Sequence, residues 1–236
     1  MQLFYNPQLQ QDATAVFFSA EESRHLIKVL RKKEGDLVHI TNGKGDLFTA
    51  EIIGMHLKQC TAQIVTHQLG DELRSPLHIA IAPTKMNDRM EWFLEKATEI
   101  GIQTITPILC ERSERKVIKA ERFQRVLQSA MKQSLRTYLP VLHPLVKLPD
   151  FINTHQDTAK YIAHCGSGNR SLFTERIQAA TPTTLLIGPE GDFTENEVAL
   201  AQKEGFVPVS LGNHRLRTET AGIMAAAAVA IKNEKN

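Results

Sequence analysis

Two short segments near the C-terminal end of the sequence bring glycine together with side chains that can bind or catalyse. The first, Gly188-Pro189-Glu190-Gly191, follows an apolar run and precedes residues that open a helix. Loops at the carboxyl ends of parallel strands bring backbone donors and acceptors close to a small molecule, so this turn is a candidate cofactor site. A tight strand-to-helix turn that binds nothing explains the same residues equally well.

The second segment, residues 211–221, is more highly charged and reads LGNHRLRTETA. It contains two arginines, a histidine and a glutamate, and an almost entirely apolar helix follows it. Placing charged side chains this close to an apolar core costs free energy, so a cluster of them indicates a functional site. Thr218 can also cap the following helix, and Glu219 favours the positive end of the helix dipole. The structural and the functional interpretation are therefore compatible.

A third group of charged side chains is cationic and discontinuous. Residues 85–89 and 111–119 each come after a predicted strand, and further cations follow at Lys132 and Arg136. Gathered at one rim, these side chains would neutralise phosphates. Acidic residues are interleaved with them, which fits a solvated charged surface as well. The net charge of +2 gives nucleic-acid binding no independent support.

The sequence lacks the motifs that are typical of several other classes of functional site. The sequence contains neither a phosphate-binding GxxxxGK[ST] loop nor a dinucleotide-binding GxGxxG turn. The nine histidines form neither HxxH nor HExxH, so we expect no metal site, and no serine lies in a GxSxG elbow. Cys60, Cys110 and Cys165 are far apart in the sequence, which indicates reduced, buried and inert thiols.

The elements that would position these residues fall into two groups. In the first group, short strands broken by glycine are predicted at residues 36–41, 46–55 and 60–68. An Asn-Gly-Lys-Gly turn between the first two strands favours a hairpin. A helix is expected ahead of them, because Ser19 and Glu22 form a possible capping box. Its apolar stripe would contain His25, Leu26, Val29 and Leu30. This pattern is typical of a small barrel.

From Leu77 onward, β-rich runs alternate with helix-period stretches, which favours a mostly parallel sheet covered by helices. Polar, turn-rich residues 70–76 separate the two patterns. We therefore expect an α/β chain with a small domain at residues 1–72 and a larger one at 73–236. In the larger domain, strands are predicted at residues 77–83, 104–110, 160–165, 183–188 and 206–212, and helices at 88–100, 120–135, 194–204 and 218–232.

Length and composition fit this organisation. The 236 residues amount to about one to two domains, and 42% apolar with 23% charged side chains is ordinary globular usage. The N-terminus has neither a basic leader nor a long apolar run, so we expect a cytoplasmic protein. The longest apolar stretch, residues 221–231, is shorter than the roughly 20 residues that cross a bilayer. It indicates a buried helix and no membrane partner.

The ordered motifs resemble those of a known family. Residues 188–198, GPEGDFTENEV, and 211–229, LGNHRLRTETAGIMAAAAV, together with 88–102 and 105–113, are similar to the bacterial ribosomal RNA uracil-N3 methyltransferases. These enzymes are the RsmE-type members of the SPOUT superfamily. The segments MQLFYNP and ESRHLIKVLRKKEGD also resemble that family, so the resemblance extends over nearly the whole chain.

This resemblance implies an RNA-binding PUA-like β-barrel at residues 1–72 and a SPOUT-type, trefoil-knotted α/β methyltransferase domain at 73–236. It implies S-adenosylmethionine as the cofactor, 16S ribosomal RNA or the assembled small subunit as the partner, and a homodimer with each pocket near the subunit contact. By position, the cofactor-binding residues would be Leu186, Ile187, Gly188, Pro189, Glu190, Gly191, Leu211, Gly212, Leu216, Arg217, Thr218, Thr220 and Ala221.

Two positions depart from the pattern of the family. Asp192 stands where a second glycine is common, and His214-Arg215 replaces the more usual arginine followed by an apolar residue. Neither change removes the LRTETA element, so we expect both to affect the shape of the loops only.

The reaction implied by the resemblance suggests roles for particular residues. Methylation of uracil N3 requires that its proton leave and that negative charge on O2 and O4 be stabilised. We expect Arg217 near the uracil carbonyls or the cofactor carboxylate, and Glu219 or Glu190 as the proton acceptor or the group that orients it. Contacts to the RNA backbone are expected from Arg24, His25, Lys28, Arg31, Lys32, Lys85, Arg89, Arg112, Arg115, Lys116 and Arg136.

Three alternatives stay open at this point. The chain can be a SPOUT-type methyltransferase that acts on another RNA position, such as a ribose hydroxyl, or an RNA-binding ribosome assembly factor without turnover. A dinucleotide-dependent oxidoreductase is disfavoured by the missing glycine fingerprint.

Overall fold

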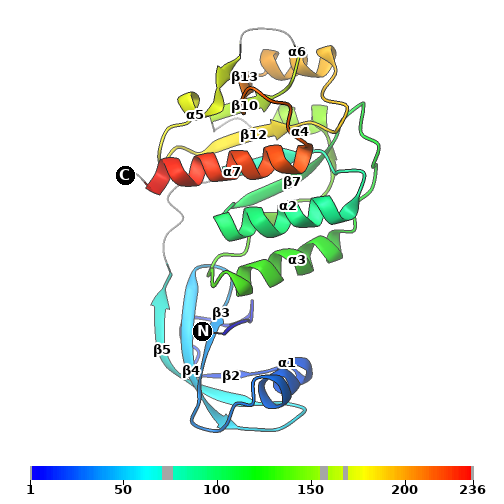
Figure 1. The fold of residues 1–236 in the computed structure, drawn as a ribbon. Helices are drawn as coiled ribbons and strands as arrows, with labels where there is room; N and C mark the ends of the chain where they lie inside the picture. The colour runs from blue at the N-terminus through cyan, green and yellow to red at the C-terminus, as the bar shows by residue number, and fades with distance from the viewer. Residues whose placement is uncertain (1, 71–76, 155–158, 167–169, 235–236) are drawn as a thin grey trace. The chain divides into compact units, whose positions relative to one another are not determined.

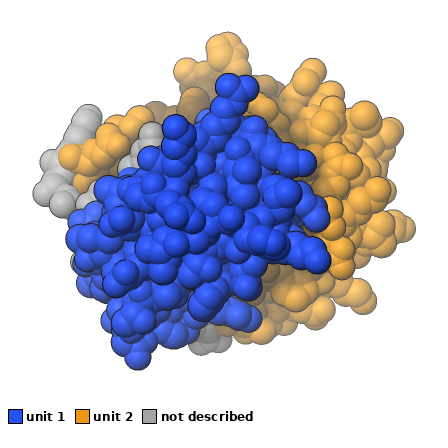
Figure 2. Space-filling model, turned by 90° about the horizontal axis from the view of Figure 1, so that it is seen from below, with its two compact units in different colours: residues 1–72, 131–139 blue, residues 73–130, 140–236 orange. Residues whose placement is uncertain are grey.

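The computed structural model describes residues 2–70, 77–154, 159–166 and 170–234. The chain divides into two compact units, residues 1–72 with 131–139 and residues 73–130 with 140–236, which Figure 2 distinguishes by colour. Most of the predicted boundary at residues 70–76 lies outside the described residues. The grouping of residues 131–139 with the first unit differs from the division predicted from the sequence, which placed them in the second domain.

The first unit is built on a mixed five-stranded sheet in the order β1-β3-β4-β5-β2 (Figure 1). β3, β4 and β5 are antiparallel to one another, whereas β1 runs parallel to β3. β1 and β2 form the two edges of the sheet, so the predicted barrel is a half-barrel. Its strands are β1 (Leu3–Tyr5), β2 (Ala15–Phe17), β3 (Leu37–Thr41), β4 (Asp46–Gly54) and β5 (Thr61–Leu69).

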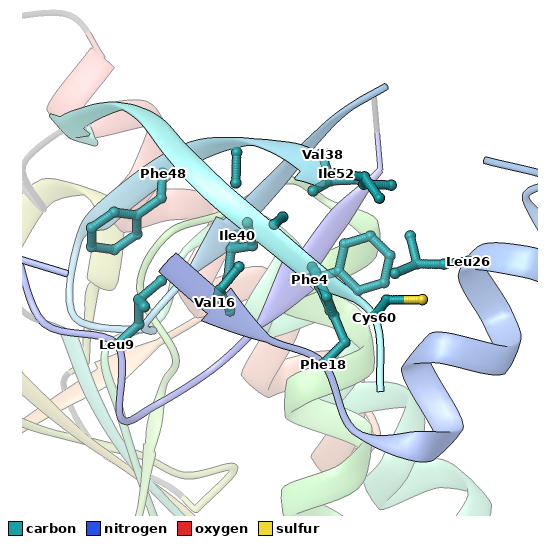
Figure 3. Close-up of a cluster of buried hydrophobic side chains, with 12 residues drawn as sticks. Phe4, Leu9, Val16, Phe18, Leu26, Val38, Ile40, Phe48, Ile52 and Cys60 are labelled. Atoms are coloured by element: carbon teal, nitrogen blue, oxygen red, sulfur yellow. The ribbon is translucent and has the colours of Figure 1, made fainter. Parts of the chain in front are cut away.

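The core of this unit follows from the two-residue period of its strands. Along β4, residues 46, 48, 50 and 52 are buried and the residues between them are not, because successive side chains point to opposite faces. Phe48 belongs to a cluster of buried side chains that also contains Phe4, Phe18 and Leu26 (Figure 3). The rings of Phe4 and Phe18 meet edge to face, with centroids 5.2 Å apart.

The first helical segment combines two kinds of helix. Ser19 caps α1 (Ala20–Arg24) by accepting a hydrogen bond from the Glu22 N–H, as its sequence predicts. A π-helical turn, η1 (His25–Val29), follows and holds more residues per turn than an α-helix. Leu26 is fully buried, but Val29 is 65% exposed. The prediction that Val29 lies on the apolar stripe is wrong, because the wider turn rotates it away from the core.

Residues 131–139 dock on the turn between β3 and β4. The Gly45 N–H donates to the Thr137 carbonyl at 3.0 Å, and the Leu139 N–H donates to the Gly43 carbonyl at 2.9 Å. Both glycines have positive φ, +76° at Gly43 and +105° at Gly45. A side chain at Gly45 would collide with the ring of Tyr138. The glycines that predicted a hairpin therefore also make room for a distant segment.

The second unit contains a sheet in the order β11-β13-β10-β12-β6-β7-β8, with β9 beside β7 (Figure 1). All pairings described in this sheet are parallel, as the alternating pattern predicts. Its strands are β6 (Leu77–Ile81), β7 (Thr104–Leu109), β8 (Val141–Leu142), β9 (Val146–Lys147), β10 (Ala159–Ala163), β11 (Ser171–Leu172), β12 (Thr183–Ile187) and β13 (Val207–Ser210). Its helices begin with α2 (Asn87–Ile100), α3 (Ala120–Gln133) and α4 (Leu148–Thr154), and continue with α5 (Phe173–Arg176), α6 (Glu195–Lys203) and α7 (Thr218–Glu234).

Helices cover both faces of the parallel sheet. α7 packs against α2, β6 and β12, and Gly222 of α7 lies over Phe93 and Ile81. The alternate residues Ala80 and Leu186 face the other way and join a core cluster with side chains of α4 and α6. β12 is buried along its whole length, which is expected of a central strand with helices on both sides.

Candidate active site

A pocket of about 680 Å³ opens at the carboxyl ends of β10, β12 and β13. These strands are parallel neighbours in the order β13-β10-β12, so the loops that follow them meet at one edge of the sheet. The lining comes from residues 163–165 with Arg170, from residues 187–190 with Asp192, and from residues 209–218 with Ala221. The volume lies within the range of about 300–1,000 Å³ that is typical of small-molecule sites.

The turn after β12 is tight because of Gly188. The Asp192 N–H donates to the Pro189 carbonyl at 2.9 Å, which closes the turn. A Cβ at Gly188 would lie only 3.2 Å from the backbone nitrogen of Phe193, so a larger residue would push the turn open. Arg112 supports the turn from outside by donating to the Gly191 carbonyl at 2.9 Å.

The loop between β13 and α7 is tied to this turn at two points. The Thr218 hydroxyl donates to the Gly188 carbonyl at 3.0 Å, and the Arg215 guanidinium donates to the Glu190 carbonyl at 3.0 Å. Thr218 is buried at the first turn of α7, so the start of this helix fixes the position of both loops. The two segments that the sequence analysis singled out therefore form one site.

The loop after β10 supplies a third wall of the pocket, which no motif in the sequence predicts. His164, Cys165 and Arg170 line the pocket there, and the Asp192 carboxylate accepts a hydrogen bond from the Cys165 N–H at 2.8 Å. Burial lowers the pKa of His164, the Arg170 charge lowers it further, and the Asp192 charge opposes both. The position of β10 between β12 and β13 brings this loop to the pocket, and that strand order leaves no local signal in the sequence.

The three thiols lie in different environments. Cys60 and Cys110 are buried, and burial, aided by the charge of Glu197, raises the pKa of the Cys110 thiol. Cys165 is exposed and lines the pocket. The expectation that all three thiols are buried is wrong for Cys165, because β10 ends at Ala163 and leaves Cys165 in the loop.

Three of the predicted cofactor residues are not among those that line the pocket. Leu186 points to the face opposite its neighbour Ile187 and is buried in the core beneath α4 and α6. Gly191 lies beneath the Arg112 side chain, and Thr220 is half-buried on α7. The predicted residues that line the pocket are Ile187, Gly188, Pro189, Glu190, Leu211, Gly212, Leu216, Arg217, Thr218 and Ala221.

The predicted catalytic residues occupy two different places. Arg217 and Glu190 line the pocket, and the Glu190 carboxylate accepts a hydrogen bond from the Lys85 N–H at 2.9 Å. Glu219 lies outside the lining and its side chain is only 7% exposed. Its Oε1 is 3.8 Å from Nε of Arg89 on α2, and its Oε2 has no hydrogen-bond partner among the described residues.

The cations predicted to contact RNA differ in how far their side chains are engaged. In the second unit, Arg115 donates to the carbonyls of Thr84 and Lys85, and the Lys85 ammonium pairs with Glu114 at 2.7 Å. Together with Arg112 and Arg89, these side chains hold the loops near the pocket, while Lys116 is exposed. In the first unit, Arg24, Lys28 and Arg31 are exposed, whereas His25, Lys32 and Arg136 are partly buried.

Within the ranges that the structure describes, no cluster of three or more histidine, cysteine, aspartate or glutamate side chains is arranged to hold a metal ion. In the same ranges, none of the helices combines the length and the apolar character that a membrane span requires.

Two family descriptions match the sequence, one in each part of the chain. Residues 71–230 match a family described as an RNA methyltransferase domain. Residues 18–65 match a family described as an RNA methyltransferase PUA domain.

Individual proteins match over nearly the full length. The ribosomal RNA small subunit methyltransferase E of Buchnera aphidicola is 31% identical, over 92% of this chain and 88% of its own. The crystal structure of a probable rRNA-methyltransferase from Porphyromonas gingivalis has a TM-score of 0.93 and 38% identity, covering 100% and 99% of the two chains. That of the Neisseria gonorrhoeae ribosomal RNA small subunit methyltransferase E bound to S-adenosyl methionine has a TM-score of 0.86 and 28% identity, covering 99% and 98%. The SPOUT-type α/β fold with an N-terminal PUA-like module, expected from the sequence, is confirmed.

Proposed function

Because the chain belongs to the RNA methyltransferase family, we propose that it transfers a methyl group from S-adenosylmethionine to N3 of a specific uridine in 16S ribosomal RNA. The observation that carries the proposal is the pocket in which the turn after β12 and the loop before α7 are joined by the hydrogen bond from Thr218 to Gly188. A solved relative with the same fold binds S-adenosyl methionine, which supports the choice of cofactor.

The residues of the pocket suit a nucleoside that carries an amino acid. The volume of about 680 Å³ accommodates a ligand of that size. Gly188 and Gly212 present backbone without a side chain, so the ligand can approach their peptide groups closely. Arg215 and Arg217 belong to the same lining, and a guanidinium is the preferred partner of a carboxylate. When bound, this cofactor supplies a methyl group made electrophilic by a sulfonium.

The protein must remove the N3 proton and stabilise the charge that remains on the uracil. Arg217 is exposed at the pocket, and we assign it the stabilisation of negative charge on the uracil oxygens. Glu190 lines the same pocket with its carboxylate oriented by the Lys85 N–H, and we assign it the acceptance of the proton. Glu219 lies against Arg89 instead, so it serves as a supporting residue at the start of α7.

The substrate uridine must be unpaired or turned out of its helix, because N3 lies on the edge that pairs in double-stranded RNA. We assign the contacts to the RNA backbone to exposed cations of the first unit, Arg24, Lys28 and Arg31. The match of residues 18–65 to an RNA methyltransferase PUA domain supports this assignment. A protein that acts on bacterial ribosomal subunits works in the cytoplasm, which is the location we propose.

We also propose that the active form is a homodimer that forms through α2 and α7. These helices pack side by side and expose three large apolar side chains, Trp92 at 44%, Met224 at 48% and Ile231 at 54%. Such side chains on adjacent helices are suited to self-association. Analytical ultracentrifugation of the wild type should give the mass of a dimer, and Trp92→Glu should shift it to the monomer. A wild type that sediments as a monomer at all concentrations contradicts the proposal.

The test of the proposed function is methyl transfer from labelled S-adenosylmethionine to small ribosomal subunits that lack the modification. Arg217→Ala should reduce the rate at least about 100-fold, the size of effect seen when a group that stabilises transition-state charge is removed. Arg125→Ala, at a side chain that is 79% exposed on α3, should leave the rate unchanged. Circular dichroism should show both variants folded.

Mapping the labelled nucleotide separates the alternatives. Label on N3 of a uridine supports the proposal. Label on a ribose or on another base supports a methyltransferase with a different target. Binding of the subunit without transfer of label supports an assembly factor, and either of the last two results overturns the proposed reaction.

A further inference from the structure

Asp192 combines an unusual backbone conformation with one hydrogen bond to its neighbour in the sequence and one to a separate loop. Its φ is +64°, in the left-handed region that glycine adopts freely and other residues rarely do. Its Oδ1 accepts from the Phe193 N–H at 2.9 Å, and its Oδ2 accepts from the Cys165 N–H at 2.8 Å. The residue also lines the pocket. This is the position at which the sequence departs from the glycine of the family pattern.

The contact with Cys165 joins two loops that are distant in the sequence. Asp192 lies in the turn after β12, and Cys165 lies in the loop after β10, 27 residues earlier. Among the described residues of that loop, 164–166 and 170, the other side-chain hydrogen bonds are internal: Arg170 donates to the His164 carbonyl, and the Gly166 N–H donates to Nδ1 of His164. The Asp192 carboxylate therefore connects the loop to the rest of the pocket.

The backbone conformation of Asp192 indicates that its side chain has a structural or functional role. Glycine would adopt a φ of +64° without strain, so aspartate is at a disadvantage here unless its carboxylate contributes something that glycine lacks. A carboxylate can accept hydrogen bonds from two backbone N–H groups at once, one on each of its oxygens. At Asp192, one of these bonds is local and the other reaches the third wall of the pocket.

We propose that Asp192 is a positioning residue that fastens the loop after β10 to the turn after β12 and so holds the third wall of the pocket in place for S-adenosylmethionine. The inference rests on the proposed function, which assigns that ligand to the pocket. Asp192 acts through Cys165 and its neighbours, and no contact between the carboxylate and the cofactor is required.

Two substitutions separate the hydrogen bond from the charge and from the backbone conformation. Asp192→Gly keeps the positive φ available and removes both acceptor oxygens. Asp192→Asn removes the charge but keeps one acceptor oxygen, and asparagine tolerates positive φ. Ala180→Gly is the matched control, because Ala180 has a φ of +54° and lies outside the pocket lining.

The first measurement is calorimetric titration of the full chain with S-adenosylmethionine. We expect the dissociation constant to rise about tenfold in Asp192→Gly, the effect of losing one hydrogen bond, and to stay within about twofold of wild type in Asp192→Asn and Ala180→Gly. Wild-type affinity in Asp192→Gly overturns the proposal. An equal loss in Asp192→Asn also overturns it, because the charge would then be responsible.

The second measurement is hydrogen exchange at the Cys165 amide, which does not require a ligand. Exchange should be faster in Asp192→Gly than in wild type and unchanged in Ala180→Gly. If exchange at the Cys165 amide is unchanged in Asp192→Gly, the Asp192 carboxylate does not hold the two loops together, and the proposal is overturned. If the wild type binds no S-adenosylmethionine, the proposed function fails, whereas the exchange experiment still decides whether Asp192 holds the loop.

Discussion

Cys165 provides a chemical reporter of the pocket. It is exposed and belongs to the pocket lining, whereas Cys60 and Cys110 are buried. We expect iodoacetamide to alkylate Cys165 in the native protein and the other two thiols only after unfolding. S-adenosylmethionine at about ten times its dissociation constant should slow this alkylation about tenfold, because only the free fraction reacts. Mass spectrometry of digested samples measures the rates, and Cys165→Ser identifies the labelled peptide. Equal alkylation rates with and without the cofactor would show that S-adenosylmethionine does not bind in this pocket.

Asp46 makes the stability of the first unit sensitive to acid. Burial alone would raise the pKa of this carboxyl, but hydrogen bonds from His67, Asn42 and Gln11 outweigh burial and hold the pKa below the ordinary value of 3.8. A lowered pKa contributes stability that is present above the unfolded-state value and is lost as the pH falls through the folded-state value. The acid limb of the stability profile should therefore lie below about pH 4.

Substitution of Asp46 tests this network. Asp46→Ala leaves three donors without their acceptor and should lower the free energy of unfolding by about 2–4 kcal/mol at pH 7. The difference from wild type should shrink as the pH falls below about 4 through the lowered pKa of Asp46, because the protonated carboxyl no longer gains the stability of a hydrogen-bonded carboxylate. Urea unfolding between pH 3 and 7 measures both effects, with Asp12→Asn, at an exposed carboxylate of the same unit, as the control. A pH-independent difference would show that the charge is not involved.

At the level of elements, α7 lies close to α2 because Gly222 has no side chain. A Cβ at Gly222 would lie 2.6 Å from Cδ2 of Phe93 and 3.3 Å from Cδ1 of Ile81. Gly222→Ala should lower the free energy of unfolding by about 1–3 kcal/mol through overpacking, although alanine favours a helix by about 1 kcal/mol. Combining it with Phe93→Leu should recover part of the loss. Stabilisation by the single change would contradict this packing.

Some of the helices and strands could be predicted from the sequence, and others could not. α2 ends at Ile100 because Gly101, with a φ of +108°, caps it as the sequence predicts. α6 begins with both hydrogen bonds of the capping box formed by Thr194 and Glu197. These signals are local. β8 and β9 have two residues each and exist only because β7 offers them a pairing edge, so no local pattern marks them.

The candidate site divides in the same way. Gly188 and Thr218 stand in motifs that the sequence alone could identify, and the structure joins them by a hydrogen bond. His164 and Cys165 reach the pocket through the order of the strands, which depends on contacts across the whole sheet. Glu219 was expected at the reaction site because of its charge, but the direction of its side chain is set by the packing of α7 on α2.

For the whole molecule, the proposed RNA contacts should appear in the salt dependence of binding. Replacing Arg24, Lys28 and Arg31 together with alanine should weaken RNA binding and reduce the slope of log affinity against log salt by about 2–3, because fewer counterions are released. Calorimetric affinity for S-adenosylmethionine should not change. Lys33→Ala with Lys58→Ala, at exposed lysines of the same unit, is the control. If the slope of log affinity against log salt is unchanged in the triple variant, these three side chains do not contact the RNA backbone.

The strand order also determines when the pocket can arise during protein synthesis. β10 lies between β12 and β13, both of which are translated after it, and the pocket is closed by Thr218 near the end of the chain. A nascent polypeptide therefore has its complete first unit before it has any place for the methyl donor. A message truncated before the codons for α7 would yield a polypeptide that contains the residues of the first unit but lacks Thr218 and therefore the complete pocket.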